Sequence, residues 1–287
     1  MAHAANRASG GDRVSLSTYA AAQLLRALPR VRLSRAVGRL CDRELPSPVA
    51  THLLRVYCRA YGVNLDEAEP CSGGYPSFDA FFTRTLREGA RTISSDALVS
   101  PADGRLSAAG RIDAGARLFV KGQAYEVGEL TGDPSDAARY TGGEFAVVYL
   151  APGDYHRVHS PADGQVTLVR GIAGDLYPVN RIGELHVPGL FVRNSRVQIV
   201  LETRGLGRIS VVMVGAVIVG RITVTGIDAS DVPPGEHRFD PAREVLRGDE
   251  LGIFHLGSTV VLLLEPGVSV TRQLGKIRYG DSLLKAV

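Results

Sequence analysis

The sequence predicts a mainly β protein of the α+β class, with a helical segment at the N-terminus and a large β domain after it. Apolar residues recur at helical spacing from Leu16 to about Gly62, and from Val99 onward short runs of β-branched residues alternate with Gly, Pro and Asp. With 287 residues, of which 45% are hydrophobic and 22% charged, the chain can bury a substantial core. We expect residues 1–65 to form the helical segment and residues 66–287 the β domain.

The first predicted helix is basic and amphipathic. Leu33, Val37 and Leu40 recur at helical spacing. Residues 13–43 carry one acid, Asp42, against seven arginines: Arg13, Arg26, Arg30, Arg32, Arg35, Arg39 and Arg43. A helix of this kind can lie on an anionic lipid surface. The alternative is a helical hairpin that packs on the core and leaves its arginines in solvent.

A second helix is predicted after the first, because Ser47-Pro48 has the composition of an N-cap followed by proline at the first helical position. Its apolar stripe consists of Leu53, Val56, Tyr57 and Ala60. No stretch of the sequence reaches the ~20 unbroken apolar residues of a spanning helix. The three cysteines fit a reducing compartment, so we expect a peripheral protein on the cytoplasmic face of a membrane. A net charge of +3 is too small to suggest a nucleic-acid partner.

The β domain is predicted from runs of branched residues between turn signals. These runs cover residues 197–201, 209–214, 217–225 and 260–264. The sequence Ser-Pro-Ala-Asp-Gly also occurs twice, at 100–104 and 160–164, each time before strand-like residues. A repeated turn and strand predicts a duplicated β unit, folded into a sandwich or a barrel-like domain. Both copies also make good β-turns, and for Asp163 we adopt that interpretation.

The tetrapeptide Leu256-Gly257-Ser258-Thr259 is the first candidate for chemistry. Glycine leaves its carbonyl sterically open, so the Ser258 hydroxyl can attack it and shift the acyl group from nitrogen to oxygen. β-Elimination and hydrolysis would then leave a pyruvoyl ketone on the new N-terminus. The alternative is an ordinary Gly-Ser turn. A ketone would suit this chain, because lysine, which holds pyridoxal phosphate, occurs three times among 33 basic residues.

The second candidate is the run Asp154 to His159, which contains His156 and His159. A metal site is disfavoured, because no acid separates the histidines as in zinc protease helices and no Cys/His cluster adds ligands. A histidine near a serine and an aspartate can take the hydroxyl proton while the aspartate orients the ring, and Asp103 could be that aspartate. The alternative is two histidines on the surface or satisfied in the core. A serine hydrolase is disfavoured, since Gly-x-Ser-x-Gly is absent from the sequence.

Together these motifs resemble the pyruvoyl-dependent phosphatidylserine decarboxylases of the membrane-associated bacterial and mitochondrial type. The resemblance runs from about Phe78 to Gly267. It is carried by residues 81–84 (FFTR), 101–104 (PADG), 121–122 (KG), 154–159 (DYHRVH), 174–180 (GDLYPVN), 191–197 (FVRNSRV), 214–216 (VGA) and 254–259 (FHLGST). Many members carry glutamate where this chain has Ser195, which puts local contacts around that turn in doubt.

The resemblance implies a proenzyme that cleaves itself between Gly257 and Ser258. It would give a β chain that ends at Gly257, with its catalytic part in residues 66–257, and an α chain of residues 258–287 that begins with a pyruvoyl group. Asp103 and His159 would act with Ser258 in cleavage, and His156 would handle a proton in decarboxylation. The substrate amine would form a Schiff base with the pyruvoyl, and phosphatidylserine would yield phosphatidylethanolamine.

The substrate implied by the resemblance favours the membrane interpretation of the basic segment, because a lipid with two acyl chains stays in the bilayer. The expected partners are therefore phosphatidylserine in an anionic membrane and the α and β chains of one proenzyme, with a homodimer as one alternative assembly. Two other functions stay open: a related pyruvoyl decarboxylase of another amino acid, and a non-catalytic lipoyl-like β-sandwich binding module.

Overall fold

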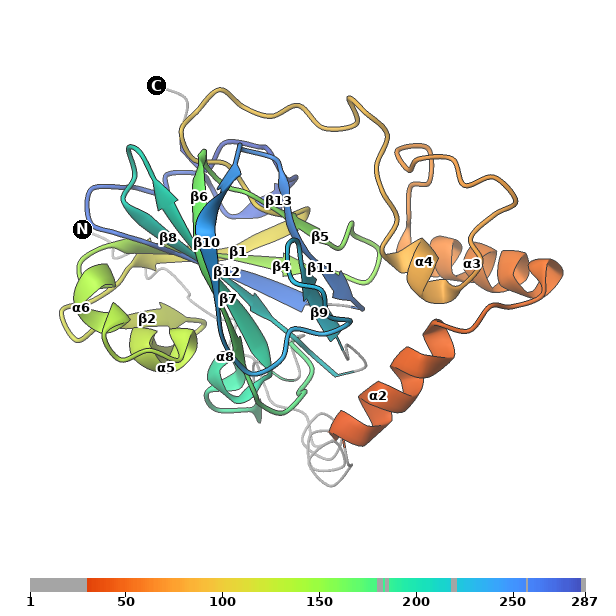
Figure 1. Cartoon of the computed structure of the whole chain (residues 1–287), viewed down its shortest axis with the longest axis horizontal. Coiled ribbons are helices and arrows are strands. Elements are labelled where there is room, and N and C mark those ends of the chain that lie inside the picture. The colour runs from red at the N-terminus through yellow and green to blue at the C-terminus, as the bar shows by residue number, and fades with distance from the viewer. Residues whose placement is uncertain (1–29, 180–182, 184–185, 218–220, 257, 285–287) are drawn as a thin grey trace, which may run out of the picture.

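The computed structural model describes residues 30–179, 183, 186–217, 221–256 and 258–284. Some of the predictions fall outside the described residues. They concern residues 1–29, with Arg13 and Arg26, and residues 180, 218–220, 257 and 285–287. Two helices open the described chain, α2 (Arg30–Cys41) and α3 (Ser47–Tyr61), and both lie to one side of the β body (Figure 1). No helix within these described ranges is long and apolar enough to cross a membrane.

Helix α3 begins one residue earlier than the sequence predicts. Pro46, not Ser47, is the N-cap residue, and its carbonyl accepts the amides of Val49 at 2.9 Å and Ala50 at 3.0 Å. The prediction of Ser47 as the N-cap was therefore wrong; no side chain caps this end. The helix ends at Tyr61, and the C-cap residue Gly62 has a φ of +65°, a conformation that glycine adopts without steric strain.

Aromatic contacts fasten α3 to the body. The Tyr57 hydroxyl donates to the carbonyl of Pro152 at 2.8 Å, and its ring packs on Phe78 and Phe81 of α4 (Phe78–Phe82) at 5.0 and 5.7 Å. Ser77 caps α4, since its hydroxyl accepts the amide of Ala80 at 3.1 Å. The two phenylalanines of the FFTR motif therefore end a short helix between α3 and the β body, with Thr83 as its C-cap and Arg84 just after it.

The body is built on one antiparallel sheet of eight strands. Their order across the sheet is β10 (Gly235–Val245), β6 (Gly164–Ile172), β7 (Arg196–Thr203), β8 (Arg208–Val214), β12 (Ser258–Leu264), β4 (Glu144–Leu150), β1 (Gly104–Arg111) and β13 (Gly275–Ile277). The strand β12 lies near the middle, between β8 and β4. The predicted runs 197–201, 209–214 and 260–264 are thus confirmed as strands.

Two smaller sheets and several short helices complete the part of the body that the structure describes. A three-stranded antiparallel sheet has the order β5 (Arg157–His159), β11 (Glu250–His255) and β9 (Arg221–Val224), and β2 (Arg117–Val120) pairs with β3 (Gln123–Glu126). The helices are α5 (Val127–Thr131), α6 (Asp136–Tyr140) and α8 (Leu190–Arg193). Within the predicted run 217–225, residues 221–224 form the strand β9.

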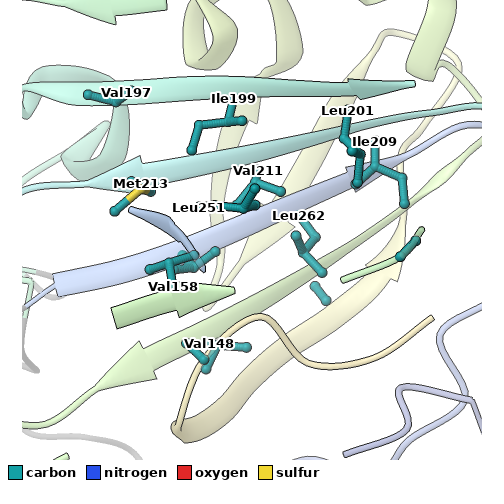
Figure 2. Close-up of a cluster of buried hydrophobic side chains, with 14 of the residues drawn as sticks. Val148, Val158, Val197, Ile199, Leu201, Ile209, Val211, Met213, Leu251 and Leu262 are labelled. Carbon is teal, nitrogen blue, oxygen red and sulfur yellow. The ribbon is translucent and has the colours of Figure 1, made fainter. Parts of the chain in front are cut away.

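Strand alternation divides the core between the two faces of the large sheet. On β12, Val260, Leu262 and Leu264 belong to one buried cluster, and Val261 and Leu263 belong to the other. The first cluster also holds side chains of the three-stranded sheet, as Figure 2 shows for Val158 and Leu251 near Leu262 and Met213. The two sheets therefore sandwich the first cluster, and the second cluster lies under the short helices and α4.

The repeated Ser-Pro-Ala-Asp-Gly turns lie against each other and lead into β1 and β6. The Val99 amide donates to the Pro161 carbonyl at 2.9 Å, and the His159 amide donates to the Pro101 carbonyl at 2.7 Å. This reciprocal exchange supports the predicted duplication. The mainly β class with an N-terminal helical segment is confirmed. Among the described residues, β10 and β13 form the two edges of the large sheet, so this sheet does not close into a barrel and the arrangement is a sandwich.

Candidate active site

Ser258 is the first residue of β12 and is 1% exposed. It lies opposite Leu150 of β4, and alternation places its side chain on the same face as Val260, toward the three-stranded sheet. Within the part of the chain that the structure describes, the Ser258 hydroxyl has no hydrogen-bond partner. A buried, unpaired hydroxyl is unfavourable for stability, so it points to a chemical use.

His156 is fully buried and lies just before β5. Its ring packs on Phe82 of α4 with centroids 4.0 Å apart, and its Nδ1 lies 2.8 Å from the Asp154 carbonyl. Because a carbonyl accepts, Nδ1 carries the proton and Nε2 keeps a lone pair. Nε2 is buried and unpartnered among the described residues. Burial lowers the pKa of His156 to about 3, so the ring is neutral near pH 7.

Arg84, the last residue of the FFTR motif, supports this arrangement. It is 6% exposed, and its Nη2 donates to the carbonyls of Gly153 and Asp154 at 3.4 Å. The Asp154 carbonyl that holds the His156 ring is therefore also held by Arg84. Burial lowers the pKa of the guanidinium, and its charge contributes to the low pKa of His156. The FFTR motif contains Arg84, but the sequence alone indicates no role for it.

His159, the last residue of β5, is 6% exposed. Its Nδ1 lies 2.7 Å from the Gly248 carbonyl and its Nε2 lies 3.2 Å from the Tyr155 hydroxyl. The ring stacks on Tyr279 with centroids 3.9 Å apart and planes 8° apart. Burial lowers the pKa of His159. The neutral ring thus donates to Gly248 and presents Nε2 as an acceptor.

Asp103 does not orient the His159 ring directly, in contrast to the sequence expectation. Both of its carboxylate oxygens accept from the Arg91 guanidinium, and Oδ1 also accepts the Tyr279 amide at 2.9 Å. The physical reason is competition: the Gly248 carbonyl already holds the histidine, and Arg91 neutralises the carboxylate. Asp103 reaches His159 through space, since its negative charge raises the histidine pKa against the effect of burial.

The strand register brings the candidate serine, the two histidines and Asp103 to one end of the sandwich. Gly104, next to Asp103, packs on the backbone of Tyr149 and Leu150, and Ser258 lies on the other side of Leu150. Two strand spacings, about 10 Å, therefore separate the Asp103 turn from Ser258. On β11, the Phe254 amide donates to the His156 carbonyl at 3.0 Å, whereas His159 pairs with Glu250. His156 is consequently nearer to residue 258 along this strand than His159 is.

An apolar cavity of about 620 Å³ opens beside Ser258. Helices α2, α3 and α4 line one side of it, and the end of β4 with Leu256 and Ser258 lines the other. Its wall is formed by Val37, Leu40, Cys41, Leu45, Leu53, Tyr57, Tyr61, Phe78, Phe82, Tyr149, Leu150, Pro152, Pro178, Val179, Ala216, Val217, Leu256 and Ser258. The site thus combines a buried hydroxyl with an apolar chamber that the N-terminal helices cover. Among the described residues, no three His, Cys, Asp or Glu side chains gather as metal ligands would.

Comparison with known proteins shows the family of this chain. The family model of phosphatidylserine decarboxylase matches residues 78–285. The chain is 44% identical over 251 residues to the phosphatidylserine decarboxylase proenzyme of Anaeromyxobacter sp. (strain K), covering 85% of this chain and 88% of the relative. It is 40% identical to the proenzymes of that name from Marinobacter nauticus (83% and 86% covered) and Myxococcus xanthus (85% and 89% covered). The chain therefore belongs to the phosphatidylserine decarboxylase family.

Proposed function

We propose that this chain is a phosphatidylserine decarboxylase proenzyme that matures by cleaving its own Gly257–Ser258 bond and converts phosphatidylserine to phosphatidylethanolamine. The observation that carries the proposal is the Ser258 hydroxyl, which is buried, unpartnered among the described residues and placed beside an apolar cavity. Family membership favours this function over a decarboxylase of another amino acid and over a lipoyl-like binding module.

The proposed maturation starts at Ser258. Its oxygen bonds to the Gly257 carbonyl carbon, the Gly257–Ser258 carbon–nitrogen bond breaks, and the hydroxyl proton ends on the freed amine. β-Elimination then releases the Gly257 carboxylate, and one water replaces the nitrogen, which leaves as ammonia, to give a pyruvoyl group on residue 258. The products are a β chain that ends at Gly257 and an α chain of residues 258–287.

We assign the base for cleavage to His159, supported by Asp103. The neutral imidazole presents Nε2 as an acceptor beside Tyr155, and it can take the serine proton near pH 7. Its protonated form would be favoured by the Asp103 carboxylate, whose charge raises the pKa of His159. Asp103 would therefore act on His159 through space by its charge, while Arg91 and the Tyr279 amide hold the carboxylate in place, and not by a hydrogen bond to the ring.

The position of Ser258 suits a pyruvoyl group, because this residue lines the apolar cavity and the ketone that would replace its nitrogen would lie at the cavity wall. When formed, this group supplies an electron sink for the carbon that loses carbon dioxide. We assign His156 to handling the proton that this carbon must receive: its bare Nε2 must first take up a proton and can then deliver it to the carbon. The Nδ1 bond to the Asp154 carbonyl, which Arg84 also holds, keeps the ring in one orientation against Phe82.

The helical segment is proposed as the membrane-binding part, with residues 66–287 as the catalytic domain. Ten large apolar residues of the described chain are substantially exposed, and seven of them lie in or just after α2 and α3: Leu33, Leu40, Val49, Leu53, Val56, Tyr61 and Leu65. A helical hairpin packed on the core would bury these side chains. Their exposure, together with the basic residues of α2, supports contact with an anionic lipid surface. The cytoplasmic face and a homodimer stay predictions.

The cavity is proposed to receive the acyl chains. Its lining by α2 and α3 connects the exposed apolar helices to Ser258, so a lipid could reach the site without its tails crossing water. A soluble serine derivative would have no use for this apolar chamber.

Intact mass and carbon dioxide release test the proposal together. The parent chain should appear as two chains and decarboxylate phosphatidylserine vesicles, whereas Ser258→Ala should stay whole and inactive. Ser107→Ala, which removes a hydroxyl from β1, is the control and should mature. Two chains from the Ser258→Ala variant would place cleavage elsewhere, and turnover of soluble phosphoserine as fast as of vesicles would contradict the lipid substrate.

The membrane contact is tested on α3. Val49 and Val56 are 54% and 53% exposed and do not line the cavity. Replacing both by serine should weaken co-sedimentation with phosphatidylserine vesicles about tenfold or more, since each buried side chain contributes on the order of 1.5 kcal/mol or more. Leu246→Ser with Leu274→Ser, at 66% and 57% exposure elsewhere on the surface, is the matched control. Equal losses in both pairs would contradict a specific membrane-binding face.

A further inference from the structure

The link between β11 and β12 is short and joins two different sheets. His255 ends β11 and pairs with Arg221 in the three-stranded sheet, and Ser258 begins β12 and pairs with Leu150 in the eight-stranded sheet. Two residues, Leu256 and Gly257, connect them. The chain is therefore held by backbone pairing on both sides of the proposed cleavage point.

Leu256 is in an unfavourable backbone conformation. Its φ is +92°, whereas the other non-glycine residues with positive φ in the described chain, Ala116 and Lys121, have values of 55° and 49° that lie close to the left-handed helical region. Side chains with a Cβ rarely adopt φ near 90°, and such strain persists where the surroundings enforce it. The Leu256 side chain is 8% exposed and packs in the second core cluster.

A polar cluster holds the residue before Leu256. His255 Nδ1 lies 2.9 and 3.0 Å from the two Asp79 carboxylate oxygens, and its Nε2 lies 3.2 Å from the Thr223 hydroxyl. Arg221 contacts the same Asp79 at 3.4 Å and binds Asp42, after α2, at 2.8 Å. The His255 side chain is thus fixed between α4 and β9 and cannot move to relax its neighbour.

We propose that the Asp79–His255 contact holds Leu256 in its strained conformation and that release of this strain speeds cleavage of the Gly257–Ser258 bond. The inference rests on the proposed cleavage site. When the carbon–nitrogen bond after Gly257 breaks and the acyl group moves to the Ser258 oxygen, the link becomes an ester that runs through the Ser258 side chain. This ester is one atom longer than the peptide link, so Leu256 can relax. Asp79 and His255 are positioning residues, since neither touches the reacting atoms.

The test compares two variants that both truncate the Leu256 side chain. Leu256→Gly removes the Cβ and with it the strain, whereas Leu256→Ala keeps the Cβ at the same φ. In a cell-free translation time course followed by gel electrophoresis, the glycine variant should cleave about tenfold more slowly than the alanine variant. In a Ser258→Ala background, where the chain stays whole, the glycine variant should melt at the higher temperature. Strain predicts these opposite directions, and simple loss of packing does not.

The contact itself is tested at Asp79 and His255. Asp79→Asn and His255→Gln should slow cleavage several-fold, and His255→Lys, which places an ammonium donor opposite Asp79, should recover most of the rate. Asp42→Asn breaks the neighbouring pair with Arg221 and should cleave like the parent. Equal rates for Leu256→Gly and Leu256→Ala would overturn the strain inference while the proposed site stands. Cleavage of Ser258→Ala would instead overturn the proposed site.

Discussion

The two Ser-Pro-Ala-Asp-Gly turns share one backbone but differ in the side chains that they present. In both, the serine hydroxyl donates to the alanine carbonyl, at 2.8 Å for Ser100 and 2.7 Å for Ser160. In both, the serine carbonyl accepts a glycine amide at 3.0 Å, from Gly280 in the first copy and Gly248 in the second. The scaffold around the two turns is therefore the same.

The differences lie at the positions next to this scaffold. The residue before the serine is Val99 in the first copy and His159 in the second. The Asp103 side chain is 10% exposed and pairs with Arg91, whereas the Asp163 side chain is 57% exposed and lies 3.5 Å from Arg247. The first copy thus buries a carboxylate and the second buries an imidazole, and their reciprocal hydrogen bonds bring the two groups to one end of the sandwich.

The two turns thus share a backbone framework, and a few side-chain differences between them provide the acid and the base. Neither turn alone holds both an acid and a base. Each aspartate also accepts a backbone amide: Asp103 accepts that of Tyr279 at 2.9 Å, and Asp163 accepts that of Arg247 at 2.7 Å. The carboxylates therefore have a structural use in both copies. A catalytic role for Asp103 must therefore exceed what Asp163 does in its own turn.

The largest effect is expected from making the second copy like the first at His159. His159→Val removes the proposed base, so self-cleavage should fall on the order of 100-fold or more. Val99 occupies the same position in the first copy, so valine should fit the fold. The fraction of uncleaved chain in a translation time course measures the effect. His237→Val, on β10, is the control, and a His159→Val chain that matures at the parental rate would assign the histidine to turn structure.

A smaller effect is expected from the two aspartates. Asp103→Asn should slow cleavage about tenfold, because it removes the charge that favours protonated His159. It should also lower the free energy of unfolding by about 2 kcal/mol, through the weakened contact with buried Arg91. Asp163→Asn should change stability by less than about 1 kcal/mol, since its ion pair is exposed.

Chemical denaturation in a Ser258→Ala background and a cleavage time course separate the two consequences. If the Asp103 and Asp163 variants slow cleavage equally, the carboxylates serve the turn in both copies, and the proposed electrostatic role is wrong.

The smallest effect concerns pH. Burial lowers the pKa of His159 in the folded chain, so below the unfolded value of about 6.5 the unfolded chain binds more protons, and stability falls as pH falls. Above about 6.5 this histidine contributes no slope. In the Ser258→Ala background, His159→Val should reduce the slope between pH 6.5 and the lower folded pKa by up to about 1.4 kcal/mol per pH unit. Urea unfolding at several pH values measures it; parallel curves would show that His159 is not the buried neutral group described.

Local pattern sufficed to predict part of the secondary structure, namely both N-terminal helices and the strands that contain the runs 197–201, 209–214 and 260–264. The branched run 209–214 lies in β8, and Leu33, Val37 and Leu40, which recur at helical spacing, lie in α2. Both Asp-Gly turns are followed by strands, β1 and β6. The prediction of Ser47 as the N-cap was wrong, because the first helical hydrogen bonds are accepted by the carbonyl of Pro46, one residue earlier. Neighbouring residues decide such features, so they can be read from the sequence.

Contacts across the fold could not be read in this way. The amino-acid sequence was sufficient to single out the candidates Ser258, His159, His156 and Asp103, because their residue types define the available chemistry and their motifs resemble a known family. Tertiary structure alone decided that Asp103 binds Arg91 and not His159. It also decided that Asp79 holds His255 across 176 residues of chain, and that α2 and α3 cover the cavity beside Ser258. Side-chain pairing between distant segments depends on which groups compete for each partner, and that competition exists only once the chain is folded.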